Sequence, residues 1–169
     1  MIEQALSQLQ KQLNQYLRQR FDVAEEIVAL GEVLGLDGSA TPACANKLVL
    51  SLAGINCERH LQKMAFTAAH QEGRADDDAA YANLSLSVLC SANFSASNYI
   101  EGLRTLSQAI HFIQTHPVLS EAPGDAKAQA ATLNLAFEDI SFAAMNELWR
   151  AHGGRYQPSV LCRLQWRAR

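Results

Sequence analysis

The sequence predicts a single α/β domain of the α+β type, with a mixed, mainly antiparallel sheet covered by helices. The chain has 169 residues, an ordinary length for one domain. Its residues are 49% hydrophobic and 18% charged, a balance that favours a folded core over a disordered chain. Segments with helical spacing of apolar residues alternate with segments in which every second residue is apolar. The predicted order is α-β-β-β-α-β-α-β across residues 1–169.

The N-terminal part is predicted to form one helix and two strands. Apolar residues recur at three-and-four spacing from Ile2 to Arg20, which predicts the first helix. Residues 26–34, EIVALGEVL, are apolar and partly β-branched, which predicts a first strand. After a loop marked by glycine and proline, the segment KLVLSLAGINC predicts a longer strand, in which Gly54 suits a β-bulge or bend. The apolar face of this strand consists of Leu48, Leu50 and Leu52.

The middle of the chain predicts a loop, a strand and a long helix. Residues 62–80 lose the apolar pattern and contain the acidic run Asp76–Asp78, which predicts an exposed loop. The segment NLSLSVLC then alternates as a strand with one strongly apolar face. Asn98 and Glu101 have the spacing of a capping box, and Pro117 limits the helix that follows. The apolar stripe predicted for this helix consists of Tyr99, Leu103, Leu106, Ile110 and Ile113.

The C-terminal part predicts a strand, a short helix and a last strand. Leu133, Leu135 and Phe137 alternate as a strand, and the segment from Phe142 to Trp149 predicts a helix ended by a glycine pair. In the last strand, apolar and basic side chains fall on opposite faces. The apolar face consists of Val160, Cys162, Leu164 and Trp166, and the other face carries Arg163, Arg167 and Arg169.

Charge and hydropathy argue against two classes of partner. The formal net charge is −3, without the broad basic field that draws proteins to nucleic acids. No apolar run approaches the roughly 20 residues that cross a bilayer, and no signal-peptide pattern opens the chain. We therefore expect no nucleic-acid partner, no membrane span and synthesis in the cytoplasm.

Catalytic and metal-binding motifs are not found in the sequence. It contains no phosphate-binding glycine loop, no zinc-binding histidine motif and no nucleophile elbow. The cysteines form no C-x-x-C pair, so we interpret them as buried free thiols in a reducing compartment. Glu138 and Asp139 are adjacent, so in a strand they would point to opposite faces. We expect no cofactor, no bound metal and no enzymatic activity.

Two long segments carry a family resemblance. The run LSLSVLCSANFSASNYIEGLRTLSQAIHFIQTHPVL, followed by LAFEDISFAAMNELWRAHGGRYQPSVLCRLQWR, resembles the domain shared by the cap, or tail-terminator, proteins of extracellular contractile injection systems. These are phage-tail-like particles of the antifeeding-prophage and Photorhabdus virulence cassette type. The opening segments IEQALSQLQKQLNQYL and LSLAGINCERHLQK are similar to the same family, so the resemblance covers nearly the whole chain.

The resemblance implies a structural role and a tail-terminator-like fold. In such particles a cap ring, expected to be sixfold, binds the last layer of inner tube and contractile sheath at the end distal to the baseplate. It stops polymerisation and fixes the length. The implied partners are further copies of the chain, the sheath protein and the inner-tube protein. The implied site of assembly is the bacterial cytoplasm, and the finished particle is cytosolic, membrane-anchored or released.

The resemblance also suggests interface residues, each with a plainer alternative. Ser91, Asn93 and Asn98 suggest a polar corner that meets a neighbouring subunit, and the alternative is a capped turn without a partner. Arg163, Arg167 and Arg169 suggest a contact that adds a partner strand or carboxylate, and the alternative is a solvated edge strand protected from aggregation.

Other features of the sequence leave similar choices open. Trp149 and Tyr156 are either core anchors or interface residues, and the acidic run is either a solvated loop or a contact to a basic face of sheath or tube. Two other functions also remain open: a baseplate or adaptor subunit of the same particle, and a small-molecule-binding or enzymatic α/β domain without a recognisable motif.

Overall fold

The computed structural model describes residues 2–35, 37–57, 84–120 and 132–166. The predicted loop 62–80, with its acidic run, lies outside these residues, and so do Arg167 and Arg169. The elements occur in the order α1 (Ile2–Phe21), β1 (Val28–Leu30), the 3₁₀ turn η1 (Pro42–Cys44), β2 (Lys47–Cys57), β3 (Leu84–Asn93), the 3₁₀ turn η2 (Ala96–Asn98), α4 (Tyr99–Thr115), β4 (Val118–Leu119), β5 (Leu133–Glu138), α5 (Phe142–Ala151) and β6 (Ser159–Trp166).

The structure confirms the mixed α/β fold and every helix and strand that the sequence predicts. Strand β1 is shorter than expected, because only three of its residues pair with β2. Strand β4 was not predicted. Its two residues pair with β5, and a two-residue strand is too short to show a period in the sequence.

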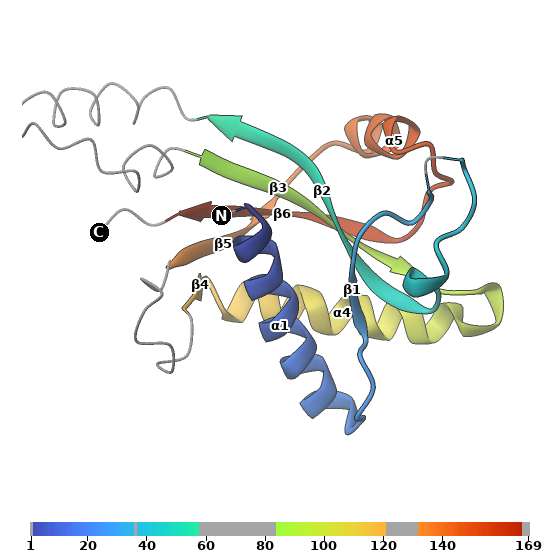
Figure 1. Cartoon of the computed structure of the whole chain (residues 1–169), viewed down its shortest axis with the longest axis horizontal. Coiled ribbons are helices and arrows are strands. Elements are labelled where there is room, and N and C mark those ends of the chain that lie inside the picture. Colours follow the sequence, from blue (N-terminus) through green and yellow to red (C-terminus); the bar gives the residue numbers. More distant parts are fainter. Residues whose placement is uncertain (1, 36, 58–83, 121–131, 167–169) are drawn as a thin grey trace, which may run out of the picture.

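The six strands of the described residues form one sheet in the order β1-β2-β3-β6-β5-β4 (Figure 1). Only β1 and β2 pair in parallel, and the other neighbours are antiparallel. Strand β6 therefore lies in the middle of the sheet, between β3 and β5, and the expectation that it forms an edge is wrong. The period of two assigns side chains to faces but does not reveal which strands are neighbours.

Helices α1 and α4 cover one face of the sheet and enclose the main core (Figure 1). Leucines of α1 pack there against leucines of β2 and β3, and Phe112 of α4 is 2% exposed. Helix α5 covers part of the opposite face, where Leu89, Trp149 and Leu161 form a second cluster. Strand β3 is buried on both faces as a result, so its serine face is more enclosed than the sequence suggests.

Helix α1 also protects the outer edge of β1. The Asn14 side-chain oxygen accepts hydrogen bonds from the backbone N–H groups of Ile27 (2.9 Å) and Val28 (3.2 Å). The Gln10 amide donates to the backbone carbonyl of Val28 (3.1 Å). Two side chains of one helix thus take the place of a further strand at this edge.

The predicted irregularity at Gly54 is confirmed, because the β2–β3 register shifts between Leu52 and Gly54. Leu48 and Leu50 are fully buried, as their shared face predicts, but Leu52 is 36% exposed. The core beneath α1 and α4 therefore ends near the bulge.

Helix α4 is rotated relative to its predicted stripe. Tyr99 was assigned to the apolar face, but it is 49% exposed. Gly102 lies on the buried side instead, and a Cβ at this position would lie 2.9 Å from the Phe94 ring. The helix ends at Thr115, which confirms the limit set by Pro117. Its buried residues are Gly102, Thr105, Leu106, Ala109, Phe112 and Ile113.

Candidate functional site

The proposed polar corner does not exist as a single exposed surface. Ser91 is 0% exposed and lies within β3, where its hydroxyl donates to the carbonyl of Val49 (3.5 Å). Its expected place at the surface is therefore wrong, because β3 continues two residues beyond it before the chain turns.

Asn93, at the end of β3, is partly buried and makes its side-chain hydrogen bonds inside the domain. Its amide donates to the backbone carbonyl of Cys44 (2.8 Å), and its side-chain oxygen accepts from the amide of Gln157 (2.9 Å). Asn93 thus connects η1 with the segment before β6. A subunit contact through this side chain would have to break these bonds.

Asn98 occupies the N-cap position of α4, but its side chain makes no capping bond, so the predicted capping box is wrong. The reason is the turn η2, which places Asn98 at φ −108° and ψ 16° rather than in the extended conformation of a capping residue. Its amide lies 3.4 Å from the side-chain oxygen of Asn46, which also accepts from the backbone N–H of Ser95 (2.9 Å). Of the three corner residues, only Asn98 lies on this exposed turn.

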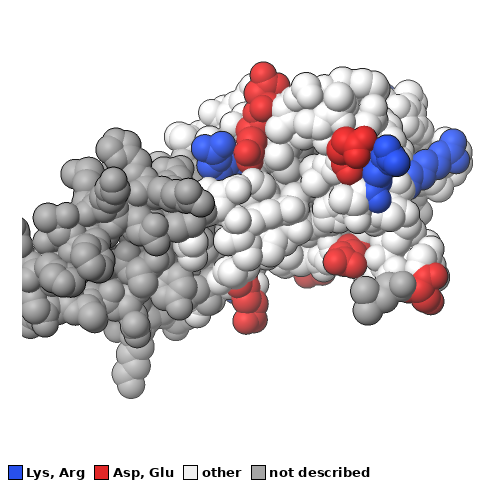
Figure 2. Space-filling view, turned by 90° about the horizontal axis from the view of Figure 1, so that it is seen from above, with Lys and Arg blue, Asp and Glu red and all other residues white. Residues whose placement is uncertain are grey.

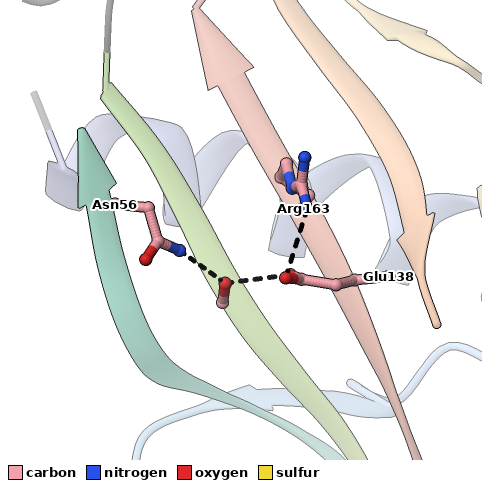
Figure 3. Close-up of polar contacts among 4 residues, drawn as sticks. Asn56, Glu138 and Arg163 are labelled. Carbon is pink, nitrogen blue, oxygen red and sulfur yellow. Dashed lines mark hydrogen bonds and ion pairs between the residues drawn. The ribbon is translucent and has the colours of Figure 1, made fainter. Parts of the chain in front are cut away.

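Arg163 lies on the sheet face opposite α1 and α4, where a polar network crosses four strands (Figure 3). The Asn56 amide on β2 donates to the hydroxyl of Ser87 on β3 (3.1 Å), which donates to Oε2 of Glu138 on β5 (2.9 Å). Arg163 on β6 donates to Oε1 of the same carboxylate (3.3 Å).

The Arg163 side chain is 43% exposed and that of Glu138 only 19%, so the carboxylate is the enclosed member of this pair. An ion pair with this exposure contributes at most about 1 kcal/mol. The sequence singled out Arg163 but not Glu138, Ser87 or Asn56. No local motif marks these residues, because the network joins strands that are distant in the chain.

The two aromatic candidates differ. Trp149 is 3% exposed, and its indole N–H donates to the hydroxyl of Ser159 (3.0 Å), so it is a core residue. Tyr156 is 51% exposed and meets the Trp149 ring edge-on, with ring centroids 6.3 Å apart. Tyr156 therefore remains available for an external contact.

The described part of the chain shows little that suggests chemistry. No group of three or more metal-ligating side chains occurs within it. Burial raises the pKa of the Cys90 thiol well above its ordinary value, and burial, with a smaller effect from Glu138, raises the pKa of Cys162 to about 12. Both thiols are therefore protonated at neutral pH and poor nucleophiles.

A cavity beside Trp149 encloses about 10 Å³, which is room for at most one water molecule. None of the helices in the described segments combines the length and hydrophobicity that a bilayer crossing requires.

Large apolar side chains are exposed at several places instead. They lie on β2 and β5, at the starts of α4 and α5, and between α5 and β6. Seen from above, the described surface is mostly uncharged, with its acidic and basic side chains standing singly or in small groups (Figure 2). The most exposed of these apolar residues are Phe142 (76%), Ile100 (61%), Ile55 (52%), Tyr156 (51%), Tyr99 (49%) and Phe137 (43%).

The chain matches a known protein family over most of its length. The model of a protein family described as the Pvc16 N-terminal domain matches residues 5–166. No curated protein matches the chain.

Proposed function

Because the chain belongs to the Pvc16 N-terminal domain family, we propose that it is the tail terminator, or cap protein, of a phage-tail-like contractile injection particle. The family membership indicates a structural component of a particle of the Photorhabdus virulence cassette type. In the more specific role, the protein binds the last layer of inner tube and contractile sheath at the end distal to the baseplate. It thereby stops polymerisation and fixes the tail length.

The observation that carries this proposal is the family match, since it spans residues 5–166 and so nearly the whole chain. The surface supports a role in assembly, because exposed apolar side chains occur on β2, β5, α4 and α5. Such residues suit protein contacts more than they suit solvent. We further propose that the protein acts without catalysis, cofactor or metal.

A terminator must present the same surface to each subunit of the tail layer beneath it. We propose that the protein does so as a closed sixfold ring, held together by head-to-tail contacts between copies. The partners in this arrangement are the chain itself, the sheath protein and the inner-tube protein. Assembly takes place in the bacterial cytoplasm.

The test is to delete the gene, purify the particles and measure tail lengths by electron microscopy. A plasmid copy with an epitope tag then serves for complementation and for localisation with gold-labelled antibody. We expect tails of scattered length or no tails without the protein, uniform tails after complementation, and label at the end distal to the baseplate.

Two outcomes would overturn the proposal. Label at the baseplate end would indicate an adaptor or baseplate subunit. Uniform tails without the protein would show that it does not control length.

A further inference from the structure

The outer edge of β2 is only half covered. Strand β1 pairs with Leu48–Leu50, and the backbone N–H of Gly31 makes one more bond, to the carbonyl of Leu50. From residue 52 to residue 57, no described strand pairs with β2 on this side. The stretch contains no charged residue and no proline, which are the usual means of protecting an edge strand.

The opposite edge of the sheet is half covered in the same way. Strand β4 pairs with Leu133 and Asn134 of β5, and the backbone N–H of Leu135 bonds to the carbonyl of Pro117. Residues 136–138 have no described strand on their outer side. The two uncovered stretches are thus the ends of β2 and β5, on opposite sides of one sheet (Figure 1).

Each uncovered stretch carries an exposed apolar side chain on the same face of the sheet. Ile55 is 52% exposed and lies opposite Leu86, whereas Phe137 is 43% exposed and lies opposite Cys162. Leu86 and Cys162 both belong to the core beneath α1 and α4. Because directly opposed residues point to the same face, Ile55 and Phe137 also point to that face.

We propose that the occupant of the β2 edge is a second copy of this chain, whose β5 pairs antiparallel with β2 so that Ile55 lies opposite the partner's Phe137. The inference rests on the proposed function, since this strand pairing would be the head-to-tail contact that a ring needs. Strands β2 and β5 run in opposite directions within the sheet, because β3 and β6 between them alternate. Placing two sheets edge to edge therefore gives an antiparallel pair.

The proposed register uses only the parts of β2 and β5 that β1 and β4 leave uncovered. With Ile55 opposite the partner's Phe137, Gly54 lies opposite the partner's Glu138 and Asn56 opposite the partner's Ala136. Only the ends of the two strands overlap in an antiparallel pair, so β1 and β4 lie outside the contact. Gly54 has no side chain, which leaves room for the glutamate on the other face. An aromatic side chain opposite a β-branched one is also a favourable cross-strand pair.

The contact is tested by disulfide cross-linking in purified particles. In a Cys57→Ser background, the double variant Ile55→Cys/Phe137→Cys is oxidised and separated by non-reducing electrophoresis. Opposed residues of an antiparallel pair lie within reach of a disulfide, so we expect a ladder of covalent oligomers that ends at the closed ring. The matched control is Ile100→Cys/Phe142→Cys, which places cysteines at two even more exposed positions of the same residue types and should give no ladder.

The single variants determine the geometry of the contact. Neither Ile55→Cys nor Phe137→Cys should form dimers alone, because the contact joins different edges. A dimer from Ile55→Cys alone would show that two β2 edges pair with each other, and the proposal would be wrong.

Gold labelling of the double variant separates the two hypotheses. Label at the distal tail end without a ladder would overturn the edge contact and leave the terminator function standing. A ladder from concentrated protein, together with no label on any tail, would support the edge contact and overturn the terminator function.

Discussion

Gly102 packs closely against Phe94, the residue that follows β3. A Cβ at this position would lie 2.9 Å from the Phe94 ring, closer than real Cβ atoms approach their neighbours. Alanine is the better helix former by about 1 kcal/mol, but forcing an atom into a packed site costs about 1–3 kcal/mol. The cost of the close contact with Phe94 should therefore exceed the gain in helix propensity.

We predict that Gly102→Ala lowers the free energy of unfolding by up to about 2 kcal/mol, measured by urea denaturation. Gln114→Ala on the exposed side of the same helix is the control and should change it by less than about 0.5 kcal/mol. A more stable Gly102→Ala protein would show that Phe94 moves aside at no cost.

Glu138 and Arg163 should contribute unequally to stability, although they form one ion pair. Removing the carboxylate leaves the hydroxyl of Ser87 without its acceptor, and Ser87 is only 7% exposed. A buried polar group without its partner costs about 1–3 kcal/mol, whereas an exposed ion pair is worth at most about 1 kcal/mol.

We predict that Glu138→Ala is more destabilising than Arg163→Ala in urea denaturation. Glu138→Gln keeps an acceptor for Ser87 and should recover most of the difference. Equal losses for the two alanine variants would mean that the bond to Ser87 adds nothing beyond the ion pair.

At the scale of elements, the side chains of α1 act as the outer neighbour of β1. Asn14→Ala would leave the N–H groups of Ile27 and Val28 without their acceptor, at a cost of about 1–3 kcal/mol.

We predict faster hydrogen exchange at the backbone N–H of Val28 in Asn14→Ala, whereas Asn14→Asp keeps the acceptor and should retain the protection. Gln15→Ala, on the exposed side of α1, is the control. Unchanged exchange at Val28 in Asn14→Ala would indicate that water replaces the side chain.

The elements were predictable because each leaves a local pattern. The period of two located β2, β3, β5 and β6, and Gly54 marked the bulge in β2. The order of strands left no such pattern, so β6 was placed at an edge. The apolar Leu161, on the same face as Arg163, indicated in the sequence that this face is partly covered. In the structure Leu161 is 6% exposed.

The candidate interface residues were harder to predict than the elements. Ser91 looked like part of a turn, because serine and asparagine are common in turns, but two further residues of β3 follow it. The network around Glu138 and the uncovered ends of β2 and β5 depend on which strands are neighbours. A single sequence does not show which strands are neighbours until the complete fold is known.

At the scale of the molecule, the sheet separates two apolar clusters that have different tryptophans. Trp166 is 8% exposed and belongs to the core beneath α1 and α4, whereas Trp149 belongs to the smaller cluster beneath α5. The clusters share β3 and β6, whose alternate residues point into one cluster or the other. Neither cluster can lose its packing without disturbing strands that support the other.

We therefore predict that the chain unfolds as one cooperative unit. In Trp166→Phe the fluorescence reports only on the α5 side, and in Trp149→Phe it reports only on the main core. The two variants will differ in stability, in part because Trp149→Phe removes the bond to Ser159, so fluorescence is compared with far-ultraviolet circular dichroism within each variant. Coincident urea midpoints of the two signals in both variants are expected, since a small domain without separable parts unfolds in one transition. An earlier fluorescence change in Trp166→Phe alone would show that the α5 side opens by itself, and the single-domain prediction would then be wrong.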